Sequence, residues 1–243
     1  VVNLLNLAEG EQIADCRAVR DFDRPGHYLM MATRNGLVKK TDLAAYRRPL
    51  RSGIIAIKLR PGDELVDVVV TKPGDEVMLS TAGGMAIRFK ESDSRPMGRN
   101  ASGVKGINLV GDDRVVGMVV ANPEASLLTV CANGYGKRTP FGPNLENEPE
   151  DEVNDVDAEA ESKPEEEEEN GGLSSAHYYR TQRRGGKGLR DIKTTARNGP
   201  VIGIVRIRDD DEVMMVTARG KIQRVPASDI SIIGRNTQGV RIM

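Results

Sequence analysis

The chain has 243 residues and a formal net charge of −1, so it can bury a core as one large or two small domains. The near-neutral charge conceals a segregation, because residues 146–169 hold 14 acidic residues and one lysine, which leaves 34 Lys and Arg against 22 Asp and Glu elsewhere. Two histidines and two widely separated cysteines argue against a histidine-based metal site or a disulfide framework. No apolar run reaches the length of a membrane span.

The first strands predicted in chain order belong to a repeat. Residues 1–7 resemble a strand that closes later copies of this repeat, and the first complete copy is 11–59. Runs rich in Val, Ile, Leu and Met predict four strands in it, at 13–19, 28–33, 37–41 and 54–59. Asn35-Gly36 joins the middle two strands and is typical of a type I′ hairpin turn.

Three more copies follow, at 65–109, 115–194 and 201–243. Their turn glycines are separated from one another by 48, 50 and 86 residues, and the four are Gly36, Gly84, Gly134 and Gly220. A marker glycine precedes each fourth strand, with spacings of 50, 85 and 51 residues, at Gly53, Gly103, Gly188 and Gly239. The period is about 50 residues, and the third copy holds an acidic insert, 144–175, whose composition predicts disorder.

The strands predicted in the later copies are short and similar in length. They are 65–70, 76–81, 85–89 and 104–109; then 115–121, 126–131, 135–139 and 189–194; then 201–207, 212–217, 221–225 and 240–243. Four-stranded units at this period predict an all-β, propeller-like array of four blades. The absence of tryptophan from the sequence excludes a WD40 propeller, so aliphatic and methionine side chains must fill the core.

The segment "QRRGGKG", residues 182–188, admits three interpretations: a phosphate-binding loop of an enzyme, a disordered RGG-type tail, or an ordered corner of a DNA-binding surface. A P-loop is excluded because Lys187 is followed by Gly188 rather than by Ser or Thr. The segment occupies the same place in its repeat as the residues before the other marker glycines, which favours an ordered loop. The sequence contains no recognisable catalytic set, so we expect no catalytic residue and no metal site in this chain.

Cations gather near equivalent positions of the other copies, which predicts a basic outer rim that contacts the DNA backbone rather than the bases. The predicted DNA-binding residues are Gln182, Arg183, Arg184, Gly185, Gly186, Lys187, Gly188, Lys39, Lys40, Arg47, Arg48, Arg51, Arg95, Arg99, Lys105, Lys137, Arg138 and Arg235.

The heptad at 182–188 resembles the GyrA box, the motif that marks the C-terminal domain of the DNA gyrase A subunit. The phrases "NGLVKKT", "SGIIAIKL", "RPMGRNASGVKGI", "NGYGKRT" and "SIIGRNTQGV" are similar to that domain too, and only residues 144–175 stand outside the resemblance. Two departures are that the heptad lies in the third complete copy rather than the first blade, and that the acidic insert is not a feature of the family.

The resemblance implies a β-pinwheel, a propeller-like array whose blades exchange strands, here a fragment with four of six blades. It implies that the domain wraps double-stranded DNA, beside the gyrase A core and the gyrase B subunit of a heterotetramer. ATP and Mg²⁺ would then serve the other parts of a type II topoisomerase that introduces negative supercoils, and the compartment would be the bacterial cytoplasm, at the nucleoid.

Two alternatives remain. The related C-terminal domain of the topoisomerase IV A subunit would bind DNA without wrapping it and lacks a true box. A protein-scaffolding propeller would show apolar anchors on its loops, where this sequence has Arg, Lys and Gly.

Overall fold

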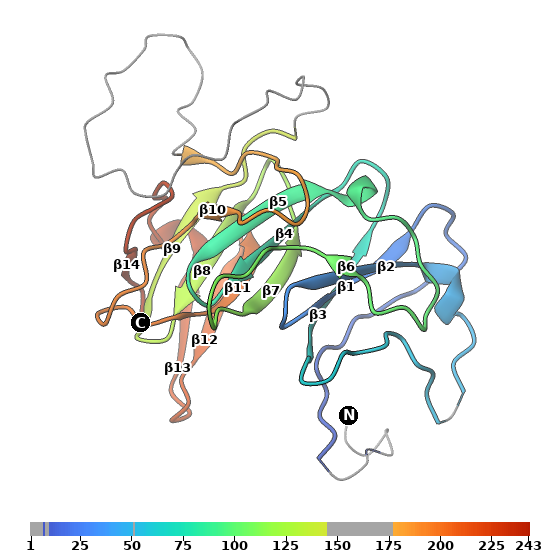
Figure 1. Ribbon diagram of the computed structural model, residues 1–243. Helices are drawn as coiled ribbons and strands as arrows, with labels where there is room; N and C mark the ends of the chain where they lie inside the picture. The colour runs from blue at the N-terminus through green and yellow to red at the C-terminus, as the bar shows by residue number, and fades with distance from the viewer. Residues whose placement is uncertain (1–6, 8–9, 51, 145–176) are drawn as a thin grey trace.

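The computed structural model describes residues 7, 10–50, 52–144 and 177–243, and their regular structure is almost wholly β-strand (Figure 1). The predictions for the segment 1–7 and for the acidic insert fall almost entirely outside these residues. Three short 3-10 helices follow the hairpins, at Leu43–Tyr46, Glu91–Asp93 and Ala227–Asp229.

Four antiparallel hairpins form the body of the array, as predicted. They are β1 (Tyr28–Thr33) with β2 (Leu37–Asp42), β4 (Glu76–Thr81) with β5 (Met85–Lys90), β8 (Ser126–Cys131) with β9 (Tyr135–Pro140), and β12 (Glu212–Val216) with β13 (Ile222–Pro226). The other strands are β3 (Leu65–Thr71), β6 (Val104–Lys105), β7 (Val115–Val120), β10 (Leu189–Arg190), β11 (Val201–Ile207) and β14 (Val240–Arg241).

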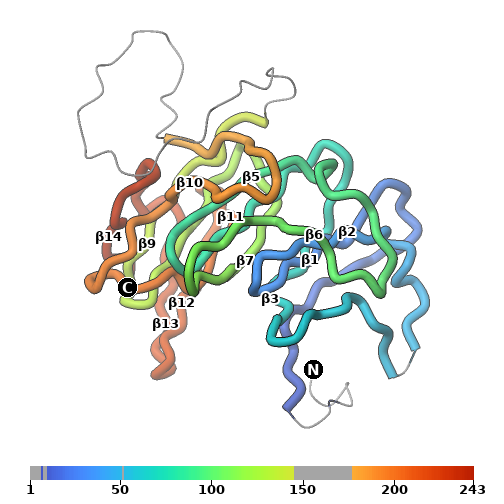
Figure 2. Tube along the Cα trace, in the orientation of Figure 1, coloured from blue at the N-terminus to red at the C-terminus, as the bar shows by residue number. Residues whose placement is uncertain are grey.

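The blades do not coincide with the sequence repeats. The three four-stranded sheets have the orders β3-β1-β2-β6, β7-β4-β5-β10 and β11-β8-β9-β14. Each sheet therefore takes its hairpin from one repeat and its first and last strands from the next, which is the strand exchange of a β-pinwheel. The chain is thus an all-β pinwheel, and Figures 1 and 2 show its sheets succeeding one another in chain order.

Two predicted strands of the first repeat are not strands. Residues 13–19 and 54–59 hold the positions that later repeats donate to the preceding hairpin, and no preceding hairpin exists among the described residues. Instead, residues 13–19 lie along β3, where Arg17 Nε donates to Val68 O at 2.6 Å and Val68 N donates to Asp15 Oδ2 at 3.1 Å. The predicted fourth strands are also shorter than expected, with two residues each.

The hairpin turns differ from the predicted type I′ form. Gly36 has a φ of +81°, but Asn35 is not among the residues with positive φ. The N–H of Gly36 donates to Thr33 O at 3.0 Å, so the turn has three loop residues and ends on a glycine in the left-handed region. The other three hairpins repeat this bond, as in Gly84 to Thr81, because only glycine enters that region without steric cost.

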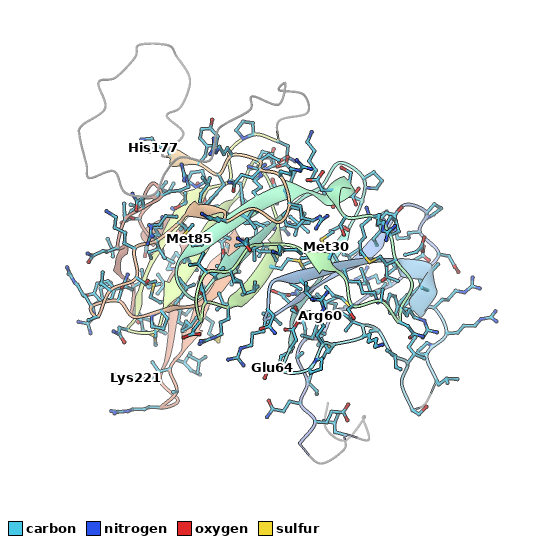
Figure 3. The ribbon with its side chains drawn as sticks, viewed as in Figure 1. Met30, Arg60, Glu64, Met85, His177 and Lys221 are labelled. Atoms are coloured by element: carbon cyan, nitrogen blue, oxygen red, sulfur yellow. The ribbon has the colours of Figure 1, made fainter. Side chains whose placement is uncertain are left out.

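The core lies between successive sheets and is aliphatic, as the composition predicts. One of its two main clusters joins Met30 and Val38 of the first sheet to Val77, Leu79 and Ile87 of the second, and Figure 3 labels Met30 within the ribbon. The strands β3, β7 and β11 lie against one another, so they form the inner side of the array. The short strands β6, β10 and β14 end the sheets on the opposite, outer side.

Candidate nucleic-acid interface

Each outer strand exposes a cation at its second residue. These residues are Lys105 on β6, Arg190 on β10 and Arg241 on β14. Only Lys105 was predicted from the sequence. Arg190 and Arg241 could have been found by the repeat, because all three cations lie two residues after a marker glycine.

The box, residues 182–188, is an ordered loop packed on the preceding repeat. Gln182 N donates to Arg88 O at 2.7 Å, and Gly185 N donates to Gly106 O at 2.8 Å. In return, Asn108 N donates to Gly186 O at 2.8 Å. The prediction of an ordered corner is confirmed, and a disordered tail is excluded.

The equivalent loop of the fourth repeat makes the same set of bonds. Ile233 N donates to Arg138 O at 2.8 Å, and Asn236 N donates to Asp191 O at 2.7 Å. Lys193 N donates to Thr237 O at 2.7 Å. The loops therefore form a continuous series in which each one lies on the last strand of the repeat before it.

Two glycines of the box have a backbone conformation or a close contact that a side chain would disfavour. Gly185 has a φ of +86°, and its counterpart Asn236 is the one non-glycine residue with positive φ in the described part of the chain, at +59°. Gly188 has a φ of +82°, and a Cβ on it would lie 2.6 Å from Ala86 O of β5. These glycines bring the loop against its neighbour rather than opening a phosphate cradle.

The cations of the box divide into two kinds. Arg183 and Lys187 are exposed. Arg184 is half-buried, and its guanidinium donates to Lys105 O and, through Nε at 3.0 Å, to Asp93 O. Arg235 of the next loop is half-buried as well, and its Nε donates to Tyr178 O at 2.8 Å, the position equivalent to Asp93. Arg184 and Arg235 hold neighbouring repeats together, which gives them a structural role, and their contact with phosphates stays a prediction.

Four predicted surface cations are buried, which corrects the expected rim. Lys39 and Lys137 are 0% exposed, and Lys40 and Arg138 are 4% exposed. Lys40 forms a buried ion pair with Glu91, whose side chain comes from the following repeat. An ammonium or guanidinium enclosed in this way cannot reach a phosphate.

The buried cations bind backbone carbonyl oxygens, some of their own repeat and some of the next. Lys39 Nζ donates to Ala56 O and Arg99 O. Arg138 Nε donates to Ile230 O at 2.7 Å, and its guanidinium pairs with Asp209. Arg88 of the second repeat, which is 1% exposed, belongs to the same group and donates to Phe141 O at 2.5 Å.

Burial also changes the acidity of these groups. Desolvation lowers the pKa of Lys39 to about 8, and the nearby positive charge of Arg99 acts in the same direction. Desolvation lowers the pKa of Lys137 too, although the carboxylate of Asp191 opposes that effect. The cost of burial is offset because each Nζ donates hydrogen bonds to two backbone carbonyl oxygens, Ala56 O and Arg99 O for Lys39, and Asp191 O and Gly234 O for Lys137.

The remaining predicted cations are on the surface or partly so. Arg48 and Arg95 are exposed, and Arg99 is half-buried. Arg47 is exposed and pairs with Asp23 at 2.7 Å. Arg51 lies outside the described residues.

The described residues contain no group of three or more His, Cys, Asp or Glu side chains placed to hold a metal ion. Both cysteines are free, and Cys16 is exposed whereas Cys131 is buried. Burial raises the pKa of Cys131 to about 11, which keeps its thiol protonated at neutral pH. Among the described helices, none has the length and apolar character of a membrane span.

A family model described as the DNA gyrase C-terminal domain, beta-propeller, matches residues 27–72, 75–122, 175–210 and 211–243. The chain belongs to this gyrase C-terminal domain family. The first two matched segments begin at a hairpin and end after the donated strand β3 or β7, so their bounds are offset from the repeats read from the sequence. Residues 123–174, which contain β8, β9 and all but the last residue of the acidic insert, lie between matched segments.

The chain is similar to the DNA gyrase A subunits of several bacteria. It is 42% identical to that of Salmonella typhimurium over 240 residues, which cover 99% of this chain and 23% of the relative. It is 36% identical to that of Staphylococcus epidermidis over 245 residues, which cover 100% of this chain and 24% of the relative. The chain thus spans about a quarter of the length of these relatives.

Two solved structures have the same gyrase-type fold. The C-terminal domain of DNA topoisomerase IV aligns with a TM-score of 0.78 at 24% identity, over 99% of this chain and 64% of that one. The DNA gyrase A C-terminal domain aligns with a TM-score of 0.77 at 23% identity, over 99% of this chain and 69% of that one. At this identity the likeness establishes the fold alone.

Proposed function

We propose that the chain binds double-stranded DNA along its outer strands and wraps it, as the C-terminal part of a gyrase A subunit. The observation that carries the proposal is the regular placement of exposed cations on β6, β10 and β14, one per blade. Cations repeated along a curved edge fit the regular phosphates of bent duplex DNA, and they carry no means of reading bases.

The box adds a second, local source of charge to this surface. Arg183 and Lys187 are exposed beside Lys105, whose carbonyl oxygen is bound by Arg184 and whose side chain lies 3.8 Å from where a Cβ on Gly185 would stand. Three cations therefore meet at the border of the second and third repeats. We take this border as the strongest DNA contact.

The proposed role also implies the activity of the whole enzyme to which the chain would belong. The chain would serve a type II topoisomerase with a gyrase B partner and ATP-dependent negative supercoiling, in the bacterial cytoplasm at the nucleoid. The family membership and the similarity to DNA gyrase A subunits support this assignment. The box and the sequence relatives favour it over a topoisomerase IV subunit.

The test is a charge-matched pair of triple variants. Changing Lys105, Arg190 and Arg241 to Ala should weaken duplex binding and lower the slope of log K against log salt by roughly 0.9 for each phosphate that is no longer bound. The control removes the same charge elsewhere, at Arg114, Arg208 and Arg219, which are exposed and do not belong to β6, β10 or β14. Equal loss of affinity in both variants would mean that general charge, and no particular track, holds the DNA.

A further inference from the structure

The two segments that flank the box are bonded to each other beneath it. Tyr179 precedes the box and Asp191 follows it, and each is 1% exposed. The hydroxyl of Tyr179 donates to Asp191 Oδ1 at 2.7 Å. The box is thus a loop whose base is closed by a buried hydrogen bond.

Two more buried side chains converge on the same carboxylate. Thr129 of β8 donates its hydroxyl to Asp191 Oδ2 at 2.6 Å. Lys137 of β9 lies with Nζ 3.0 Å from Asp191 Oδ1, and it also donates to Asp191 O at 2.8 Å. We name these four residues, Thr129, Lys137, Tyr179 and Asp191, the clasp.

The clasp also reaches the loop of the fourth repeat. Lys137 Nζ donates to Gly234 O at 2.8 Å, and Asn236 N donates to Asp191 O at 2.7 Å. The box and the loop that follows it along the outer side are therefore held from one buried point.

The complete clasp occurs only in the repeat that contains the box. Counted from the turn and marker glycines, the counterparts of Thr129 are Met31, Leu79 and Met215, and those of Asp191 are Ala56, Gly106 and Ile242. The counterparts of Tyr179 are Ala44, Ser94 and Ile230, and those of Lys137 are Lys39, Ile87 and Gln223. The other repeats fold with mainly apolar residues at these places, so blade formation does not require the clasp.

A buried ionic network that folding does not require needs another reason, because apolar side chains of similar volume are often at least as stabilising. The box provides such a reason, because its backbone has to be held in one form. Its three glycines allow several backbone forms, and any of these that the folded loop still populates would have to be removed by DNA binding at an entropic cost. A closed base removes part of that freedom before DNA arrives.

We propose that the clasp positions the box for DNA, by holding the loop in the form that presents Arg183 and Lys187. Its members are positioning residues, because all four are buried beneath the loop. The inference rests on the proposed DNA binding and adds the residues that regulate its strongest contact.

The test combines Tyr179→Phe with the double variant Arg183→Ala/Lys187→Ala. Tyr179→Phe keeps the ring against Phe141 and removes only the hydroxyl that closes the loop. We expect faster amide hydrogen exchange across 182–188 without DNA, and duplex binding about three- to tenfold weaker because fewer molecules hold the competent loop. In the double variant, Tyr179→Phe should still speed exchange but should no longer weaken binding.

The control is Tyr135→Phe, which removes a hydroxyl bonded to Arg197 in the same repeat and should leave exchange in the box unchanged. If Tyr179→Phe folds poorly, Thr129→Val provides a second test. It removes another hydrogen bond to Asp191, and we expect it to change exchange and DNA binding in the same way as Tyr179→Phe. A chain that binds no DNA would overturn the proposed function, whereas the exchange measurement would still report the clasp. Unchanged exchange, or equal weakening of DNA binding with and without the box cations, would overturn the clasp.

Discussion

The role of each cation depends on what the next repeat places over it. Lys39 and Lys40 of the first repeat and Lys137 and Arg138 of the third hold equivalent positions that the sequence assigned to the rim, yet all four are enclosed. Their partners, such as Glu91 for Lys40 and Gly234 for Lys137, lie 51 and 97 residues away in the chain. The position of a cation within its repeat can show that it is equivalent to cations of other repeats. Only the fold shows that a loop from the next repeat covers it.

The division within the box makes a prediction for single residues. Arg184→Ala removes bonds from a guanidinium to two carbonyl oxygens, so it should lower the free energy of unfolding by about 1–3 kcal/mol. Arg183→Ala/Lys187→Ala removes exposed charge, so it should weaken DNA binding with little change in unfolding. Urea denaturation and duplex titration of the same samples measure both quantities.

A role for Arg184 in DNA binding rather than in stability would contradict this division of the box. If Arg184→Ala unfolded like the wild type while its DNA affinity fell as far as that of the double variant, Arg184 would be a phosphate contact. The box would then act as one cationic unit.

At the scale of elements, the hairpins follow from local sequence, whereas the outer strands depend on pairing with another repeat. The hairpins were predicted to within a residue or two, because their glycine turns and apolar runs are local. The outer strands were predicted four to six residues long but contain two, and two first-repeat segments are not strands. Those elements depend on a hairpin from another repeat, which a local pattern cannot report.

The close approach of the box to β5 predicts a contrast between two glycines of one loop. Gly188→Ala should destabilise the domain by about 1–3 kcal/mol or more, because its φ is +82° and its Cβ would meet Ala86 O at 2.6 Å. Gly186→Ala should be nearly neutral, since its φ is not positive and the nearest atom would lie 3.5 Å away. Thermal and urea unfolding of the two variants provide the comparison.

Equal effects of Gly186→Ala and Gly188→Ala would contradict this account. That result would mean that the glycines serve flexibility in general. The loop would not then be built against one strand edge.

At the scale of the whole molecule, the repeat and the family resemblance predicted the pinwheel, which the fold and the family match both show. The candidate site was predicted in part. The box was found as an ordered corner, but Arg190 and Arg241 were missed and four buried cations were included. The difference arises because outer strands are defined by pairing between repeats, not by composition.

The fourth hairpin shows how far the array depends on that exchange. In the described chain, β12 and β13 pair only with each other, and they expose Met214, Val216 and Ile222. Figure 3 shows Lys221 at the tip of this hairpin, away from the body. The exposed cations Lys105, Arg190 and Arg241 all lie in the three complete blades.

The central claim is that this surface bends duplex DNA around itself with one hand. The direct measurement is to ligate nicked circular DNA in the presence of increasing amounts of the chain and to resolve the topoisomers after the protein is removed. We expect a shift of linking number in one direction that grows to saturation and that shrinks for the Lys105, Arg190 and Arg241 variant. DNA that is bound to saturation with an unchanged topoisomer distribution would contradict wrapping.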